Sequence, residues 1–316
     1  MKNFINSNFK HFNSRILKDA SNEWVNHLQN NGKMFLAMGG AMSTAEIGIS
    51  LAKAIRNNKI HAISTTGANL EEDIFNLFAN ETYQQIDDWE HLTVDKEIQI
   101  ENRVLDVCIP ESVMRHVEEM ILPLWLQAEE NNRSYFPHEY FFQLLDTTPF
   151  KNLNVSNSWL AAAKEKNIPI YIPGWEDSTM GNILVSKVLR KKIKSFDIIK
   201  SGLDYMHHLV DWYSDTSQNH KMGFFQIGGG ISGDFPICCV PLINQDLYDF
   251  EDYKIVDFWK YFCQISDGHK SYGSYSQAGP SEKITWGKLG VDSEMFSINS
   301  DATIVFPLII EYILEK

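Results

Sequence analysis

One local pattern recurs along the chain and limits its possible folds more than any other feature. A short apolar run ends in small or polar residues, and an amphipathic helical segment often follows. The five runs are residues 34–38, 60–63, 168–172, 223–227 and 261–265. Short apolar runs of this kind are typical of parallel strands that are buried on both faces, with helices as the crossovers between them. The pattern predicts an α/β fold with an open, doubly wound, mostly parallel sheet, and a ligand crevice at the carboxyl ends of its strands.

Two segments stand outside this rhythm. Residues 1–30 have no chemistry to assign and are predicted to form an amino-terminal arm or helix, followed by a single α/β domain over residues 31–316. Within that domain, residues 78–150 interrupt the alternation and are predicted to form an insertion or outer layer in part. Its strongest elements are a strand at residues 106–110 and an amphipathic helix at residues 111–130.

The charge balance argues against nucleic acid as a partner. The 28 Lys and Arg against 41 Asp and Glu give a net charge of −13, whereas phosphate binding needs a concentrated positive field. The basic run Lys187–Lys194 is a local exception. We expect it to be the solvated face of a helix that turns Val188, Leu189 and Ile193 inward.

The remaining composition favours a cytoplasmic protein without a metal. The four cysteines form no C-x-x-C pair, which is typical of reduced thiols in a reducing compartment. The amino terminus lacks the apolar core of a signal peptide, and no apolar stretch is long enough to span a membrane. The histidines and cysteines show no spacing that fits a zinc site.

Residues 65–73, Thr-Thr-Gly-Ala-Asn-Leu-Glu-Glu-Asp, form the first candidate site. A strand is predicted to end here, and a helix to open with three acids in its first turn. Acids at that position stabilise the helix dipole, and they can equally bind a ribose hydroxyl or a substrate ammonium. The spacing alone leaves these roles open.

Gly228-Gly229-Gly230, directly after an apolar run, is the second candidate site. Glycines allow a backbone to approach a ligand closely, and with Gly233 the string matches G-x-G-x-x-G. A dinucleotide fingerprint should open a helix, but Asp234-Phe235-Pro236 does not favour one.

A Gly/Ser-rich loop that leads into Trp286-Gly287-Lys288 is the third candidate site. A lysine held against an indole loses hydration, which disfavours the ammonium. The neutral amine is the form that makes imines. A surface lysine near a packed tryptophan would give the same triplet.

Together these features resemble the deoxyhypusine synthase family, and more closely its bacterial deoxyhypusine-synthase-like members. The resemblance covers residues from about Met34 to Ile313, and its most specific part pairs Thr285-Trp286-Gly287-Lys288 with residues 301–307, Asp-Ala-Thr-Ile-Val-Phe-Pro. It implies a Rossmann-like NAD-binding domain, and a homotetramer with sites shared across a dimer interface.

The resemblance also implies an NAD-dependent alkyl-group transferase with no net redox change. Such an enzyme oxidises spermidine, passes the aminobutyl group to an active-site lysine with loss of 1,3-diaminopropane, and transfers it to an acceptor amine. The acceptor is a protein lysine in the eukaryotic enzyme and putrescine in homospermidine synthases of similar type. For this chain we expect a small amine such as putrescine.

The family pattern assigns roles position by position. It makes Lys288 the imine-forming nucleophile. The implied NAD contacts are Thr66, Gly67, Ala68, Glu72, Asp177, Gly229, Asp267, Gly268, Asp301 and Ala302. The implied polyamine contacts are Glu71, Glu72, Asn182, Asp234, Gly273, Ser274, Tyr275, Glu282 and Trp286.

Several of these positions depart from the eukaryotic pattern. Asn182 and Tyr275 stand where that pattern has acids, Asp234 replaces a histidine, and Gly40-Ala41 replaces a Ser-Asn pair. Such changes move the places where a polycation's charges can be paired. A different amine or guanidine donor on the same scaffold, or an NAD-binding tetramer without turnover, are therefore alternative interpretations.

Overall fold

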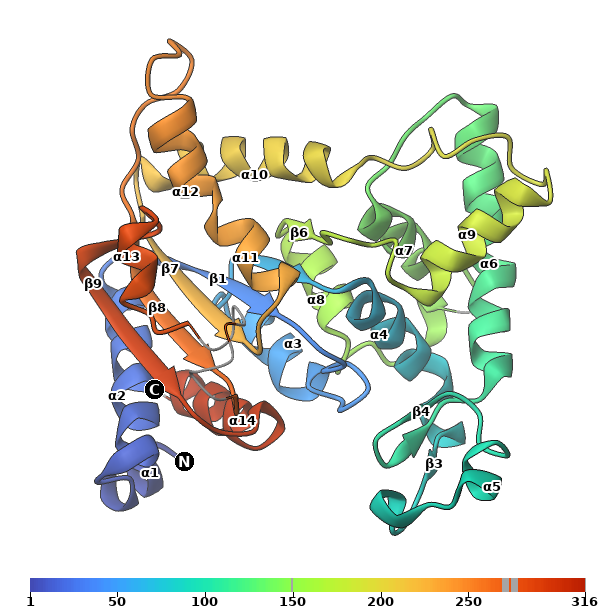
Figure 1. Cartoon of the computed structure of the whole chain (residues 1–316), viewed down its shortest axis with the longest axis horizontal. Helices are drawn as coiled ribbons and strands as arrows, with labels where there is room; N and C mark the ends of the chain where they lie inside the picture. Colours follow the sequence, from blue (N-terminus) through green and yellow to red (C-terminus); the bar gives the residue numbers. More distant parts are fainter. Residues whose placement is uncertain (149, 269–272, 274–277, 316) are drawn as a thin grey trace.

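The computed structural model describes residues 1–148, 150–268, 273 and 278–315. Six parallel strands form the central sheet (Figure 1). Their order is β6 (Ile170–Tyr171), β2 (Ala62–Thr65), β1 (Gly32–Met38), β7 (Lys221–Ile227), β8 (Trp259–Ile265) and β9 (Leu289–Ile298). This is the 3-2-1-4-5-6 order of a Rossmann sheet, so the predicted doubly wound α/β fold is confirmed.

All five predicted strands are present, and the sixth, β9, was missed. The five apolar runs became strands because they are buried on both faces of the sheet. β9 instead mixes buried and exposed positions, such as the fully buried start at Leu289 and the 87% exposed Val291. Because several of its side chains are exposed, β9 carries no continuous apolar run that the sequence could reveal.

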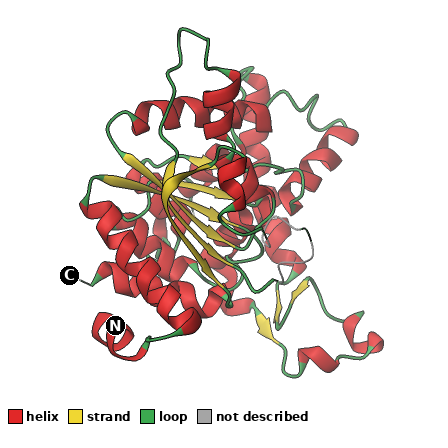
Figure 2. Ribbon diagram, turned by 60° about the vertical axis from the view of Figure 1, so that its left-hand side comes forward, coloured by secondary structure: helices red, strands yellow, loops and turns green. Residues whose placement is uncertain are grey.

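Helices cover both faces of the sheet (Figure 2). On one face, Phe225 of β7 packs against Trp24 of α2 (Phe12–Gln29) and Phe306 of α14 (Ala302–Leu314). On the other face, Phe224 packs against Trp259, which contacts Tyr213 of α10 (Gly202–Ser217). Because successive strand residues point to opposite faces, this one pair of phenylalanines anchors both helical layers.

The helices lie as follows along the chain. The longer ones are α2 (Phe12–Gln29), α3 (Gly48–Arg56), α4 (Gly67–Ala79), α6 (Glu111–Glu130), α7 (Pro137–Leu145), α8 (Trp159–Lys166), α9 (Thr179–Leu189), α10 (Gly202–Ser217) and α14 (Ala302–Leu314). The short ones are α1 (Lys2–Asn8), α5 (Val94–Glu97), α11 (Ile231–Ile237), α12 (Cys239–Pro241) and α13 (Glu282–Thr285). In the described part of the chain, no helix combines the length and apolarity that a membrane span requires.

Residues 78–150, which interrupt the alternation of strands and helices, contain a second, small sheet. Its antiparallel strands are β3 (Gln84–Gln85), β5 (Val107–Cys108) and β4 (Arg103–Val104). Together with α5 this sheet projects from the body of the molecule, at the lower right of Figure 1. The strand and helix expected at residues 106–130 are present as β5 and α6. The division into an N-terminal arm and one domain stays a prediction.

Two local expectations need correction. The basic run is solvated as expected at Arg190, Lys191, Lys192 and Lys194, and Ile193 is buried, but Leu189 at the end of α9 is 78% exposed and Lys187 is a buried ion-pair partner of Glu118. The triple glycine does open a helix, since α11 begins at Ile231 with Gly230 as its N-cap. Pro236 is the sixth of the seven residues of α11, where it removes one backbone donor.

Candidate active site

The carboxyl edge of the sheet has its topological switch point between β1 and β7. β1 and β7 are neighbours, although β2 and β6 come between them in sequence. The turns that follow these two strands are in contact, because a Cβ atom on Gly39 would lie 2.7 Å from the carbonyl oxygen of Gly229. The only residue that fits at Gly39 without displacing this backbone is glycine. This is the predicted crevice position, and Gly229 lies in it.

The second predicted turn lies beside this crevice. Thr66 is the N-cap of α4: its Oγ1 accepts a hydrogen bond from the Asn69 backbone N–H and donates one to the Gly40 carbonyl oxygen. Gly67 and Ala68 therefore form the first turn of α4. The three acids lie one turn further along the helix than expected, because the helix begins at Gly67 and not after Asn69.

Glu71 holds the start of another helix. It is 3% exposed, and its carboxylate accepts hydrogen bonds from the backbone N–H groups of Thr179 and Met180, at 2.9 and 2.8 Å. These groups are two of the orphan donors at the start of α9. Burial raises the pKa of Glu71 to about 7, and the two backbone donors oppose that rise.

Glu72 and Asp73 are bound in similar ways. Glu72 accepts a hydrogen bond from the Thr44 backbone N–H at 3.1 Å, and burial raises its pKa. Asp73 accepts hydrogen bonds from the Ser158 hydroxyl and from the backbone N–H groups of the first two residues of α8. Burial raises the pKa of Asp73 to about 7. The three acids thus tie α4 to its neighbours.

Lys288 approaches from the opposite edge of the sheet. It directly precedes β9, whose first residue pairs with the first residue of β8. Gly287 has a φ of +67°, a backbone conformation that favours glycine, and it forms the turn into Lys288. The Lys288 Nζ then lies 2.7 Å from Oδ1 of Asp234 in α11. This contact joins Lys288, which lies at the amino edge of the sheet, to the helix that starts at the glycine crevice.

The two other residues of this loop are open to solvent. Trp286 is 69% exposed, and the centroid of one of its rings lies 5.9 Å from the Lys288 Nζ. Glu282 is also exposed, and its carboxylate accepts a hydrogen bond from the Gly279 backbone N–H. The Lys288 side chain itself is only 11% exposed. The arrangement is a buried amine beneath an exposed indole and a half-exposed carboxylate.

The remaining predicted residues are distributed around the carboxyl edge. Asp177 follows β6 and is exposed, Asp267 and Gly268 follow β8, and Asp301 and Ala302 begin α14. The Asp301 carboxylate accepts hydrogen bonds from the backbone N–H and hydroxyl of Thr303, so it acts as an N-cap.

Asn182, one of the predicted polyamine positions, lies on α9 and not beside the Lys288 loop. Asn182 donates a hydrogen bond to the Ser178 carbonyl oxygen and lines a hollow between α6 and α9 with Arg115 and Glu118. Gly273 has a φ of +68° and is exposed. Ser274 and Tyr275 lie outside the described residues.

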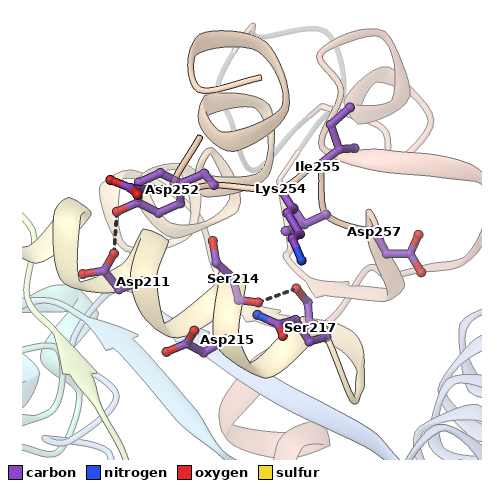
Figure 3. Close-up of a pocket in the computed structure, with 11 residues that line it drawn as sticks. Asp211, Ser214, Asp215, Ser217, Asp252, Lys254, Ile255 and Asp257 are labelled. Atoms are coloured by element: carbon purple, nitrogen blue, oxygen red, sulfur yellow. Dashed lines mark hydrogen bonds between the residues drawn. The ribbon is translucent and has the colours of Figure 1, made fainter. Parts of the chain in front are cut away.

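A larger hollow than the one at Asn182 lies elsewhere in the described structure. It has a volume of about 690 Å³ and lies between α10 and residues 252–257 (Figure 3). Asp211, Asp215 and Asp252 line it, and the Tyr253 hydroxyl donates a hydrogen bond to Asp211. None of the residues predicted from the sequence lines this hollow, so its size does not make it the active site.

One residue of the lysine loop was missed. Lys283 is 2% exposed, and its Nζ lies 4.9 Å from the ring centroid of Phe262 in β8. Its backbone carbonyl accepts a hydrogen bond from the Lys288 backbone N–H at 3.0 Å. The residue types around it gave no signal, because a lysine in a polar loop is ordinarily solvated.

The comparisons with known proteins identify the family. The family model described as deoxyhypusine synthase matches residues 6–313. The chain belongs to the deoxyhypusine synthase family. It is 25% identical to "Probable deoxyhypusine synthase 1" of Archaeoglobus fulgidus, over 96% of this chain and 90% of that protein. It is 29% identical to the "Deoxyhypusine synthase-like protein" of Nostoc sp., over 99% of this chain and 80% of that protein.

A solved structure of the family has the same fold. The crystal structure named "putative deoxyhypusine synthase" from Entamoeba histolytica superposes with a TM-score of 0.61 and 15% sequence identity. The match covers 98% of this chain and 90% of that one. Membership of the deoxyhypusine synthase family indicates a transferase.

Proposed function

We propose that this protein transfers an aminobutyl group from a polyamine such as spermidine to a small amine such as putrescine, through an imine on Lys288. The observation that carries the proposal is the Lys288 amine, held 2.7 Å from Asp234 in a largely buried position beneath Trp286. A buried lysine with a carboxylate partner and an open indole suits covalent capture of an alkylamine.

The carboxyl edge of the sheet fits NAD as the cofactor. At the switch point, Gly39 and Gly229 bring the two turns together, and a Cβ atom on Gly228 or Gly230 would meet no other atom within 4 Å. Small residues and free space here allow a backbone to approach a dinucleotide. Thr66, Gly67, Ala68 and Gly229 would hold NAD, with Asp301 and Ala302 at the start of α14. Bound NAD would supply removal of a hydride from the carbon beside the secondary amine, and its return to the product.

The residues of the chain would perform the transfer itself. The Lys288 amine forms a bond to the oxidised carbon, and the bond from that carbon to 1,3-diaminopropane breaks. The acceptor amine then adds to the same carbon and displaces Lys288. Asp234 holds the lysine between these steps, and Trp286 covers the alkyl chain of the substrate.

The exposure of the loop supports a homotetramer with shared sites. Trp286 and Glu282 are exposed in the single chain, while the glycine crevice is formed by other elements. A second subunit that covers this loop would exclude water from the imine, which hydrolysis would otherwise destroy.

Product analysis tests the proposal. Purified protein is incubated with NAD and spermidine, with and without putrescine, and the amines are separated by chromatography. We expect 1,3-diaminopropane in both reactions and homospermidine only with putrescine. NAD binding without 1,3-diaminopropane would reject spermidine as the donor, and a panel of other amines and of guanidines such as agmatine would follow.

A further inference from the structure

Gln226 is a buried polar side chain that the proposed reaction does not yet use. It is the penultimate residue of β7 and is 0% exposed. Its Nε2 donates a hydrogen bond of 2.8 Å to the Gly228 carbonyl oxygen, while its Oε1 accepts no hydrogen bond from any described residue. An unpaired buried oxygen costs free energy, so packing alone would favour an apolar side chain here. What the amide contributes is the hydrogen bond to Gly228.

That hydrogen bond acts on the turn that forms one wall of the crevice. Gly228 follows β7 directly and has a φ of +70°. Its backbone N–H donates a hydrogen bond of 2.9 Å to the Ile265 carbonyl oxygen at the end of β8, and its carbonyl oxygen accepts the one from Gln226. Because both polar groups of the Gly228 backbone are bound, its orientation relative to the sheet is fixed.

The orientation of Gly228 also sets the direction of the next backbone N–H. The Gly228 carbonyl and the Gly229 N–H belong to one planar trans peptide group, so they point in opposite directions. Because the carbonyl is turned toward the buried Gln226 amide, the Gly229 N–H is turned away from it. Across the crevice, even an added Cβ atom on Gly39 would lie 3.5 Å from the Gly229 nitrogen, so the glycine there leaves space beside this donor.

We propose that Gln226 is a positioning residue that turns the Gly229 N–H toward an acceptor oxygen of NAD in the crevice. This inference rests on the proposed function, in which Gly229 holds the cofactor. A donor that is already oriented needs no rearrangement when the ligand binds, which increases affinity. Without the Gln226 amide, the peptide between Gly228 and Gly229 loses its anchor, and glycines on both sides of it allow it to rotate.

A crystal structure of the wild-type protein with NAD tests the contact directly. We expect the Gly229 nitrogen to lie within about 3.2 Å of an NAD oxygen, with its N–H directed at that atom. The hydrogen bond from Gln226 to the Gly228 carbonyl oxygen should persist in the complex. Bound NAD with no oxygen within about 3.5 Å of the Gly229 nitrogen overturns the inference.

Gln226→Met tests the same role by affinity. Methionine is similar to glutamine in length, but it has no N–H that could hold the Gly228 carbonyl. We expect the dissociation constant for NAD, measured by calorimetry, to rise about tenfold, the effect of losing one hydrogen bond to the cofactor. In turnover, the KM for NAD should rise by a similar factor, while kcat at saturating NAD should change less than about twofold.

Tyr213→Phe is the matched control for a general loss of stability. The Tyr213 hydroxyl, on a 0% exposed residue of α10, donates a hydrogen bond of 2.7 Å to the Asp257 carbonyl oxygen, just before the amino end of β8. The variant loses the same kind of bond at the opposite edge of the sheet. It should lower the free energy of unfolding in urea, while its NAD affinity should stay within about twofold of wild type.

The outcomes distinguish this inference from the proposed function. Wild-type NAD affinity in Gln226→Met, or an equal loss of affinity in Gln226→Met and Tyr213→Phe, overturns the role of Gln226 while the cofactor stands. Absence of NAD binding to the wild-type protein overturns the proposed cofactor, and with it the role of Gln226. The crystal structure of the wild-type complex remains decisive even if Gln226→Met does not fold.

Discussion

Charge is buried both on α4 and around Lys288, and these two regions differ in what the charged atoms contact. On α4, the carboxylates of Glu71 and Asp73 accept hydrogen bonds from the first N–H groups of α9 and α8. Around Lys288, the charges face each other: an amine, a carboxylate of Asp234 that is 48% exposed, and a second amine of Lys283.

The difference distinguishes charged groups that hold helices in place from charged groups that remain able to bind a substrate. A carboxylate whose lone pairs are taken by helix N-termini fixes the positions of those helices and has little capacity left for a substrate. A carboxylate that faces an amine and solvent can exchange its partner. Glu71, which the family pattern assigns to polyamine, therefore acts first as a helix cap, whereas the Asp234 carboxylate faces both the Lys288 amine and solvent.

The largest effect should follow from removing the nucleophile. Lys288→Ala should reduce release of 1,3-diaminopropane by at least about a thousandfold, because the proposed transfer passes through a covalent bond to the Lys288 amine. NAD affinity, measured by calorimetry, should remain within about twofold of wild type, because the proposed cofactor residues lie at the other edge of the sheet. Loss of NAD binding would show that Lys288 supports the crevice instead, and the contrast between the two regions would fail.

Removing a helix cap should unfold the protein more easily. Asp73→Ala leaves two N–H groups of α8 and the Ser158 hydroxyl without their acceptor, at a cost of about 3 kcal/mol in the free energy of unfolding. Urea denaturation followed by tryptophan fluorescence measures this cost. The exposed Asp87→Ala should change the same free energy by less than about 0.5 kcal/mol. Equal effects would mean that Asp73 is not the cap that its contacts indicate.

These contacts show where sequence reasoning succeeded and where it stopped. The strands were predicted because an apolar run buried on both faces is a local signal, and the family pattern pointed to Lys288. The roles of Glu71 and Asp73 were not predicted, because their partners lie 85 to 109 positions away in the chain. Lys283 was missed for the same reason: the packing of α13 against the sheet, and not its neighbours in sequence, buries it.

The buried acids also predict how stability depends on pH. With a pKa of about 7 in the folded state, well above the usual value of 4.5, Glu71 binds more protons folded than unfolded between these values. The stabilising contribution of the Glu71 carboxyl to the free energy of unfolding is therefore fully present below about pH 4.5 and is lost as the pH rises through about 7.

Glu71→Gln isolates this contribution because glutamine cannot ionise. The difference in the free energy of unfolding between the variant and the wild type should shift in favour of the variant by roughly 2 to 3 kcal/mol as the pH rises from about 5 to about 8. Urea denaturation at both pH values measures the change. The exposed Glu81→Gln should follow the wild-type slope, and a Glu71→Gln slope equal to it would show that the Glu71 carboxyl stays ionised throughout.

The smallest expected effect concerns Trp286, the exposed indole beside Lys288, and it tests whether this region serves substrate binding and not stability. Trp286→Ala removes a 69% exposed indole, so the free energy of unfolding should change by less than about 0.5 kcal/mol. The indole contacts the alkylammonium chain in the proposed complex, and its loss should raise the KM for spermidine roughly tenfold with a smaller change in kcat. Phe12→Ala, at a 91% exposed aromatic of α2, should alter neither quantity. If Trp286→Ala instead destabilises the protein and leaves KM unchanged, the indole belongs to the structural region and the polyamine chain lies elsewhere.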